Sequence, residues 1–503
     1  MSKFENRSAV WAMAGILLSG CVLFGGADAG ATEEVQEITE TTAVDSAGEA
    51  ALDSTEAAEL DPAEEVSRVT VIAEVFGDGE KPSAAALEYP VEMDSSTLEP
   101  EDFEVAGQTI TGVFTNSEAA IPESSVPGSF VILKFACENS ESPESMGGGQ
   151  NRDAGGMELK NGAGADGGKS DGGEDRADAG NIGKDGGLGN GNNLEMDGGM
   201  ENESGAGLSV MVVQKGEIAG TDGTIYAGND TEVESSEWTE LIVEDFQLLE
   251  YTDPDTGWTI PYSLYFPENY EESREYPLVF FVADAGANSD NPIGNLTQGN
   301  GATVWASPEE QAKHECIVLS PQYTNSLINS IGALTTDENV WSDGLTLVSN
   351  LLHFVIEKYS VDENRIYGTG QSQGCMTNIA LSDKYPDLFA AQLLVAGQWN
   401  VEEMEAMKDK NLWIVVCEGD SKAYPGMNEA TERWESLGSA VARSEMWDST
   451  STAEQFDELV EQMEAQGCRI NYTVFEGGSH TYTWSVAYSI EGIRDWLFAQ
   501  TKE

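Results

Sequence analysis

A serine flanked by glycines is the feature of this sequence with the clearest chemical meaning. The run GQSQG at 370–374 follows a short expected strand at 365–368 and precedes an expected helix at 375–384. The pattern G-x-S-x-G between a strand and a helix predicts a sharp turn that exposes the hydroxyl of Ser372. Without that context the same pattern also fits a glycine-rich turn with a chance serine.

A serine hydroxyl becomes a strong nucleophile only when a nearby base takes its proton. The sequence contains three histidines, His314, His353 and His480. In the chain order that accompanies this serine motif, an acid and then the histidine follow the serine. Only His480 satisfies that order, so we predict that it is the base. We interpret His353 as a packed helical residue and His314 as a surface residue before a strand.

Asp420 is the predicted acid, although many carboxylates lie between Ser372 and His480. The segment 412–417 is typical of a buried strand, and Asp420 comes shortly after its end. Open α/β sheets place their sites at the carboxyl ends of their strands. There the carboxylate would orient the imidazole and stabilise its charged form. The alternative is a solvated turn carboxylate.

The composition describes a large and very acidic chain. Its 503 residues are enough for two or three domains. It has 90 acidic against 24 basic residues, a formal net charge of -66. Such a charge repels nucleic acids and anionic membranes, so neither they nor a polyanionic substrate is an expected partner.

The first residues predict export from the cytoplasm. A basic start precedes an apolar stretch that is short for a membrane span, which is typical of a signal peptide over 1–30. The sequence LSGC at 18–21 resembles the lipobox of bacterial lipoproteins, with Cys21 as the residue that would be acylated. Acyl chains would attach the protein to the cell membrane. The alternative is an ordinary cleaved signal and free secretion.

The other cysteines favour neither a disulfide framework nor a zinc site. Their number is odd and no C-x-x-C occurs. Cys375 lies next to the serine motif but follows its last glycine, so it is a poor nucleophile candidate. We expect no metal and no cofactor.

Residues 31–65 are acidic and contain no lysine or arginine, which predicts a solvated linker. Regularly spaced short strands predict a β-sandwich over 66–250. Residues 138–207 consist largely of Gly, Asp, Asn, Glu and Ser without an aromatic residue, which predicts a disordered insertion in that sandwich. The strands expected here lie at 69–75, 85–91, 109–115, 129–135, 208–214 and 240–246.

Residues 251–503 alternate between strand and helix patterns, which predicts an α/β doubly wound domain. The continuous apolar run at 276–282 is typical of a parallel strand buried on both faces. Further strands are expected at 317–320, 366–368, 393–396, 412–417 and 470–475. Helices are expected at 341–359, 375–384, 427–437, 453–466 and 485–500.

Beyond the serine motif, several runs carry a family resemblance. They are VFGDGEK at 75–81, YPLV at 276–279, SPQ at 320–322, VDENRIY at 361–367, KYPDLFA at 384–390, EGD at 418–420 and GSH at 478–480. On these runs the chain resembles secreted α/β-hydrolase esterases with an N-terminal immunoglobulin-like domain. These are relatives of polyhydroxybutyrate depolymerase-like and feruloyl esterase-like enzymes, often called predicted peptidases. The resemblance implies an α/β-hydrolase domain preceded by an immunoglobulin-like β-sandwich.

The resemblance also implies an oxyanion hole made of two backbone N–H groups. One belongs to Gln373, which follows the nucleophile. The other comes from the loop ADAG at 283–286, most simply from Ala285 or Asp284. The family often has HGAG there, so this chain departs from the pattern. A carboxylate beside an oxyanion would repel it, and the side chain of Asp284 is therefore expected to point away.

These observations together predict an extracellular serine hydrolase that cleaves carboxylic esters, small or polymer-linked, through an acyl-enzyme. Trp399 and Trp484 are weak candidates for an aromatic substrate wall, with ordinary core positions as the alternative. Two other functions remain open. One is a serine peptidase with the same Ser372, Asp420 and His480 triad, and the other is a non-catalytic cell-surface binding protein. The sequence does not indicate an oligomeric state.

Overall fold

The computed structural model describes residues 66–136 and 208–502. The predicted signal peptide (1–30) with its Cys21, the acidic linker (31–65) and the insertion (138–207) lie outside the described residues. Within the described ranges, no helix is both long and apolar enough to cross a membrane.

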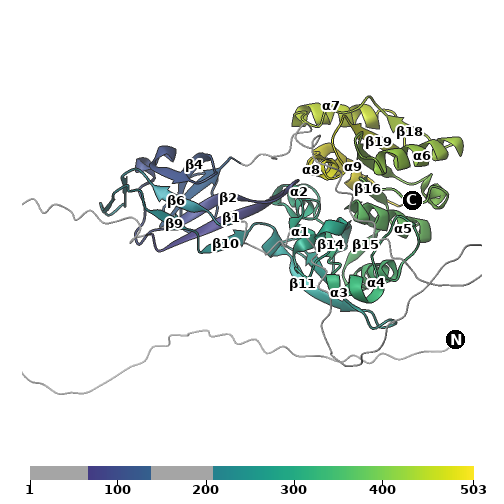
Figure 1. The fold of residues 1–503 in the computed structure, drawn as a ribbon, viewed down its shortest axis with the longest axis horizontal. Coiled ribbons are helices and arrows are strands. Elements are labelled where there is room, and N and C mark those ends of the chain that lie inside the picture. Colours follow the sequence, from purple (N-terminus) through teal and green to yellow (C-terminus); the bar gives the residue numbers. More distant parts are fainter. Residues whose placement is uncertain (1–65, 137–207, 503) are drawn as a thin grey trace, which may run out of the picture. The chain divides into compact units, whose positions relative to one another are not determined.

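The first described part consists of β-sheets (Figure 1). A five-stranded sheet has the order β10-β1-β2-β5-β4, and a three-stranded sheet has the order β3-β6-β9. The strands of the first sheet are β1 (Arg68–Phe76), β2 (Gly79–Glu88), β4 (Ile110–Asn116), β5 (Phe130–Phe135) and β10 (Glu237–Glu240). Those of the second are β3 (Phe103–Val105), β6 (Met211–Gln214) and β9 (Glu232–Glu234), beside a small pair β7 (Ile218–Ala219) and β8 (Ile225–Tyr226).

Alternation along β1 explains why the two larger sheets pack together. Val69 and Val71 belong to a buried cluster that also contains Phe103 of β3 and Val212 of β6. Ile72, one position along, belongs to a separate cluster on the other face. Because successive side chains of a strand point to opposite faces, the apolar run of β1 buries both of its sides.

Two expectations for this part were wrong in detail. The strand expected at 85–91 begins at Gly79, because it pairs with β1 as a hairpin. The segment expected as a strand at 240–246 instead ends β10 at Glu240 and turns into the short 3₁₀ helix η4 (Val243–Asp245). Ile242 has φ 69°, which interrupts an extended backbone at that point.

The second described part is built on a nine-stranded sheet with the order β11-β12-β14-β13-β15-β16-β17-β19-β18. From β14 to β18 all neighbours are parallel, whereas β11 and β12 are joined antiparallel at one edge. The strands are β11 (Gln247–Thr252), β12 (Thr259–Tyr265), β13 (Tyr276–Val282), β14 (Ile317–Pro321), β15 (Val361–Gln371), β16 (Ala391–Val395), β17 (Leu412–Cys417), β18 (Val441–Arg443) and β19 (Ile470–Phe475). This sheet thus begins at β11, slightly before residue 251.

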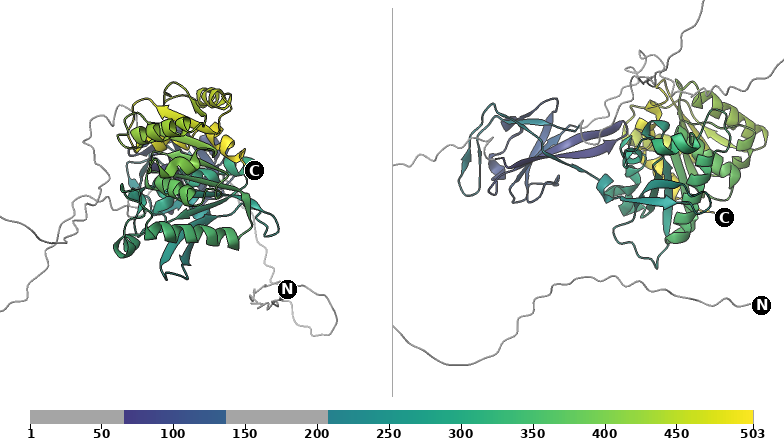
Figure 2. Two further views of the ribbon diagram at one scale, coloured as in Figure 1. Left: turned by 90° about the vertical axis from the view of Figure 1, so that its right-hand side faces the viewer. Right: turned by 60° about the horizontal axis from the view of Figure 1, so that its bottom comes forward.

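Helices cover both faces of this sheet, as the two views in Figure 2 also show. Leu278 and Phe280 of β13 pack in one cluster with residues of α4, α5 and α6. Val279 and Phe281 pack in another cluster with residues of α7, α8 and α9. The helices are α1 (Gly294–Thr297), α2 (Pro308–Lys313), α3 (Asn325–Ile331), α4 (Asp343–Lys358), α5 (Gln373–Lys384), α6 (Ala423–Ser436), α7 (Ala453–Glu464), α8 (Tyr482–Ala487) and α9 (Glu491–Phe498). The α/β organisation expected from the sequence is confirmed.

The helix expected at 485–500 is two helices. The chain leaves α8 after Ala487, and Ile490 has the extended angles φ -81° and ψ 103° before α9 begins. Tyr488 and Ile490 are both buried, so the break allows both of these side chains to pack in the core. Helical periodicity in the sequence continues through the break and does not reveal it.

A pH-dependent prediction concerns Glu80, at the start of β2. Burial, together with the nearby charge of Glu240, raises its pKa from 4.5 to about 7. The folded chain therefore holds this proton more tightly than the unfolded chain, and stability falls as pH rises from about 4.5 to about 7. Glutamine carries no charge at either pH. We therefore expect the stability of Glu80→Gln, measured relative to the native chain, to increase when the pH is raised from 5 to 8. Urea unfolding at both pH values measures this, and an equal difference at the two would contradict it.

Candidate active site

Ser372 lies on a strained turn between β15 and α5. Its backbone angles, φ 50° and ψ -115°, are ones that residues with a side chain rarely adopt. The N–H of Ser372 donates to Val395 of the neighbouring strand at 3.0 Å, which fixes the turn to the sheet. Close packing explains the second motif glycine, since a Cβ at Gly374 would lie 1.7 Å from the carbonyl oxygen of Val282.

The structure brings together the three side chains that the sequence singled out. Nε2 of His480 lies 2.8 Å from Oγ of Ser372, and Nδ1 of His480 lies 2.5 Å from Oδ2 of Asp420. An ionised carboxylate only accepts hydrogen bonds, so Nδ1 is the donor toward Asp420. Nε2 is then left to accept the hydroxyl proton of Ser372.

Asp420 is 2 % exposed, and both of its carboxylate oxygens are used. Oδ1 accepts the backbone N–H groups of Lys422 and Ala423 at the start of α6, at 3.0 and 2.9 Å. Burial alone would raise the pKa of this carboxyl, but the hydrogen bond and charge of His480 and the two backbone donors outweigh it, and the pKa is lowered. The carboxylate is therefore held ionised beside the imidazole.

Direct contacts join the loops that carry the acid and the histidine. The N–H of Gly419 donates to the carbonyl of Gly477 at 3.1 Å, and the N–H of Gly477 donates to the side chain of Glu418 at 3.2 Å. A Cβ at position 419 would lie 2.0 Å from the carbonyl oxygen of Gly478, so the approach requires glycine there. The relative position of Asp420 and His480 thus follows from backbone contacts.

Two backbone N–H groups near the serine have no partner among the described residues. Gln373 is the first residue of α5, so its N–H has no acceptor within the helix. In the loop after β13, the N–H groups of Asp284, Gly286 and Ala287 all have acceptors, whereas none is found for Ala285. Gln373 was predicted for an oxyanion hole, and Ala285 was one of the two alternatives given for the loop donor; that role stays a prediction.

The carboxylate of Asp284 is occupied within its own loop. Its Oδ1 accepts the N–H of Gly286 at 2.6 Å, and it also accepts the amide N–H of Gln298. The side-chain oxygen of Gln298 in turn accepts the N–H of Asp284 and an amide N–H of Gln371, each at 3.2 Å. Gln298 therefore ties the loop to the strand that ends at the serine.

Sequence reasoning missed Gln298, and it also missed Asn288. The side chains of Asn288 and Gln373 exchange two hydrogen bonds at 3.0 and 3.1 Å, and thereby join the end of the loop to the first turn of α5. No local pattern marks these partners, because each pair is distant in the chain and meets only after the sheet has formed.

The two tryptophans occupy different surroundings. Trp484 lies edge-on against the imidazole of His480, with ring centroids 5.3 Å apart. Trp399 is 4 % exposed, belongs to the core, and donates its indole N–H to Glu403 at 2.7 Å. Trp484 is therefore adjacent to the site, whereas Trp399 has packing partners of its own. Their contact with a substrate stays a prediction.

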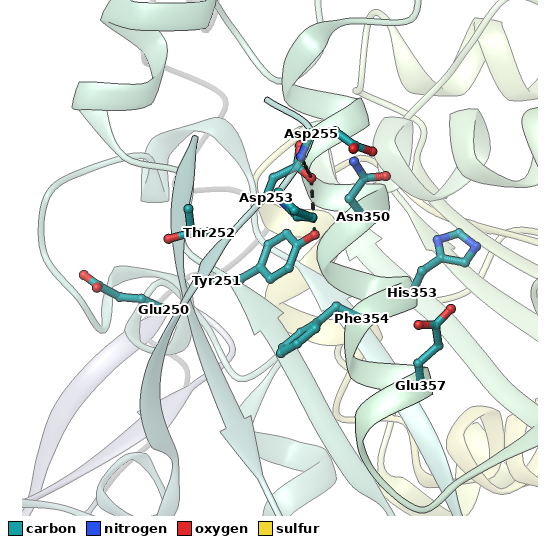
Figure 3. Close-up of a pocket in the computed structure, with 10 residues that line it drawn as sticks. Glu250, Tyr251, Thr252, Asp253, Asp255, Asn350, His353, Phe354 and Glu357 are labelled. Atoms are coloured by element: carbon teal, nitrogen blue, oxygen red, sulfur yellow. Dashed lines mark hydrogen bonds between the residues drawn. The ribbon is translucent and has the colours of Figure 1, made fainter. Parts of the chain in front are cut away.

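The other candidate groups are either unreactive or distant from Ser372 in the fold. Burial raises the pKa of the Cys375 thiol, which opposes formation of a thiolate. A cavity of about 480 Å³ lies between the β11–β12 turn and α4 and is lined partly by Asp253, His353 and Phe354 (Figure 3). It contains none of the predicted site residues, and Asp253 is already bonded to Thr256 at 2.5 Å. We place the candidate site at Ser372 because a potential nucleophile, base and acid are in hydrogen-bond contact there.

Comparison with known proteins finds similarity to esterases in both described parts of the chain. Residues 68–227 match the family model described as "Esterase Ig-like N-terminal domain". A solved structure, a thermostable esterase, is 25% identical with a TM-score of 0.61 and covers 87% of this chain and 100% of its own. The predicted fold, an α/β-hydrolase domain preceded by an immunoglobulin-like domain, is confirmed.

Two fungal enzymes are similar over shorter stretches. Feruloyl esterase B of Talaromyces stipitatus is 32% identical over 106 residues, which span 21% of this chain and 29% of that protein. Acetylxylan esterase A of Emericella nidulans is 29% identical over 208 residues, which span 39% of this chain and 60% of that protein. In both cases this chain spans less than two thirds of the relative's length.

The strain at Ser372 gives a stability prediction. Glycine adopts positive φ without steric cost, so Ser372→Gly should be more stable than Ser372→Ala by about 1 kcal/mol. At an ordinary position the order is reversed, because glycine gains more freedom in the unfolded chain. Urea unfolding of the two variants measures the difference. A glycine variant less stable than the alanine variant would show that the turn is not strained.

Proposed function

We propose that this chain is a serine hydrolase that cleaves carboxylic esters through an acyl-enzyme. The observation that carries the proposal is the continuous hydrogen-bonded series from Ser372 through His480 to Asp420 on a strained strand-to-helix turn. That arrangement has the parts of a serine nucleophile, a general base and an orienting acid. The similarity to esterases supports the same reaction class.

In this proposal the hydroxyl oxygen of Ser372 attacks the ester carbonyl while Nε2 of His480 takes the hydroxyl proton. Asp420 stabilises the imidazolium through the bond to Nδ1. The carbonyl oxygen becomes negatively charged and is bound by the N–H groups of Gln373 and Ala285. His480 then gives its proton to the leaving alcohol. Water, activated by the same imidazole, releases the acid and restores the serine.

The names of the relatives suggest the substrate class that we propose. The names of the fungal proteins specify feruloyl and acetyl esters, the latter on xylan. We therefore place acyl esters of carbohydrate polymers first among the substrates. A panel of acetyl, butyryl, feruloyl and hydroxybutyrate esters distinguishes an aromatic from a short aliphatic acyl preference.

The location outside the cytoplasm, with Cys21 as the attachment point to the membrane, belongs to the same proposal. It rests on the sequence of residues 1–30 alone. Export suits an enzyme for polymer-linked esters, because such polymers do not enter the cell. Radiolabelled palmitate incorporation into the native chain but not into Cys21→Ser tests the lipid attachment.

Loss of the nucleophile tests the reaction directly. Ser372→Ala should lower ester turnover by roughly 10³-fold or more while leaving the fold intact. A fluorophosphonate probe should label the native chain and not this variant. If the native chain takes up no probe and turns over no ester, it is a binding protein rather than an enzyme. Cleavage of peptide anilides without ester turnover would instead identify a peptidase.

The oxyanion donor in the loop permits a cleaner test, because proline lacks an N–H. Ala285 begins a 3₁₀ helix and follows Asp284 at ψ 166°, an arrangement that accepts proline. We expect Ala285→Pro to lower kcat by roughly 100-fold with little change in stability. The matched control, Ala285→Ser, keeps the N–H and should retain most of the activity. Equal kcat values for the proline variant and the native chain would place the second donor elsewhere.

A further inference from the structure

A second cluster of potential ligands lies where α2 meets α9, among residues that the proposed reaction does not use. One carboxylate oxygen of Glu310, a ring nitrogen of His314 and a carboxylate oxygen of Asp495 lie within 4.8 Å of one another. Glu310 lies in α2 and His314 directly follows its end, four positions on, where its backbone N–H still donates to the carbonyl of Glu310 at 2.8 Å, so the two side chains share one face. Asp495 comes from α9, far along the chain.

Glu310 is the unusual member of this cluster. It is 2 % exposed, and its Oε2 accepts from Nε of Arg494 at 2.7 Å. Its Oε1 is buried and has no hydrogen-bond partner among the described residues. A buried carboxylate oxygen without a partner is energetically costly, and a bound cation would satisfy it.

The imidazole of His314 is already held in place. It stacks on Phe498 with ring centroids 4.4 Å apart and planes 10° from parallel. Its Nε2 lies 2.8 Å from Oδ1 of Asp495, so these two potential ligand atoms are in direct contact. The Asp495 side chain is 47% exposed, which leaves a side open for water as a further ligand.

The charges around the cluster tolerate a divalent cation. Glu310 pairs with Arg494, and Lys313 beside the cluster pairs with Glu491. Counting Asp495 as well, three carboxylates face two cationic side chains, so the cluster keeps one excess negative charge. The chain as a whole carries -66, a field that also attracts cations.

From these contacts we propose that Glu310, His314 and Asp495 form a binding site for a divalent metal ion such as Zn²⁺. One imidazole nitrogen and two carboxylate oxygens are ligands that zinc accepts, at about 2.0–2.2 Å. The ion would replace the direct bond between His314 and Asp495 and join α9 to α2. The cysteine spacing, from which the sequence predicted no metal, does not bear on this site because it uses no thiolate.

Calorimetric titration of the full chain with ZnCl₂ tests the site. We expect one binding event tighter than that of the other acidic residues, and we expect it to be weakened at least tenfold in His314→Ala and in Asp495→Asn, since loss of even a supporting group costs about that much. Bound Zn²⁺ should also raise the unfolding temperature of the native chain. Asp495→Asn keeps the side-chain shape and leaves the stacked imidazole in place. Weaker binding by this variant is therefore not explained by a folding defect that follows removal of the imidazole.

His353→Ala is the matched control, because it removes the other histidine outside the proposed triad. It should bind Zn²⁺ as the native chain does. The many acidic residues elsewhere in the chain would bind equally in every variant and cannot imitate the expected pattern. Native affinity in either cluster variant, an equal loss in His353→Ala, or no binding by the native chain would each overturn the proposal. Ester turnover by Ser372 is independent of these outcomes.

Discussion

The candidate site depends on one steric constraint, the close packing of the start of α5 against the end of β13. The carbonyl of Val282 leaves no space for a side chain at Gly374, and the turn between β15 and α5 must therefore be tight. Ser372 accommodates the tight turn by adopting a positive φ. Strain of this kind persists only where surrounding structure fixes it, here through the bond from Ser372 to Val395.

The remaining groups meet the serine because parallel strands end at a common edge. β15, β17 and β19 lie in one sheet, and the loops that follow them carry Ser372, Asp420 and His480. Backbone contacts between the last two loops fix the carboxylate beside the imidazole. Hydrogen bonds from Gln298 and Asn288 fix the loop after β13 beside α5. The geometry of the candidate site is therefore a property of the sheet edge and its loops together.

Much of this could be predicted from the sequence, for reasons that are local. The apolar run at β13 revealed a strand buried on both faces, and glycines around Ser372 revealed the turn. Elements with weak local signals were missed, such as the three-residue β18 and the break between α8 and α9. Their conformation is set by pairing with β19 and by core packing, which no short segment encodes.

The sequence by itself determined which residues are the candidates for the site, because a single histidine follows the serine motif and strand-end positions distinguish Asp420 from other acids. Only the tertiary structure decided how those groups are held. The Ala285 donor, the Gln298 bonds and the pairing of His314 with Asp495 all join segments distant in the chain. Such contacts depend on three-dimensional packing, and chain order carries no information about the distances between side chains.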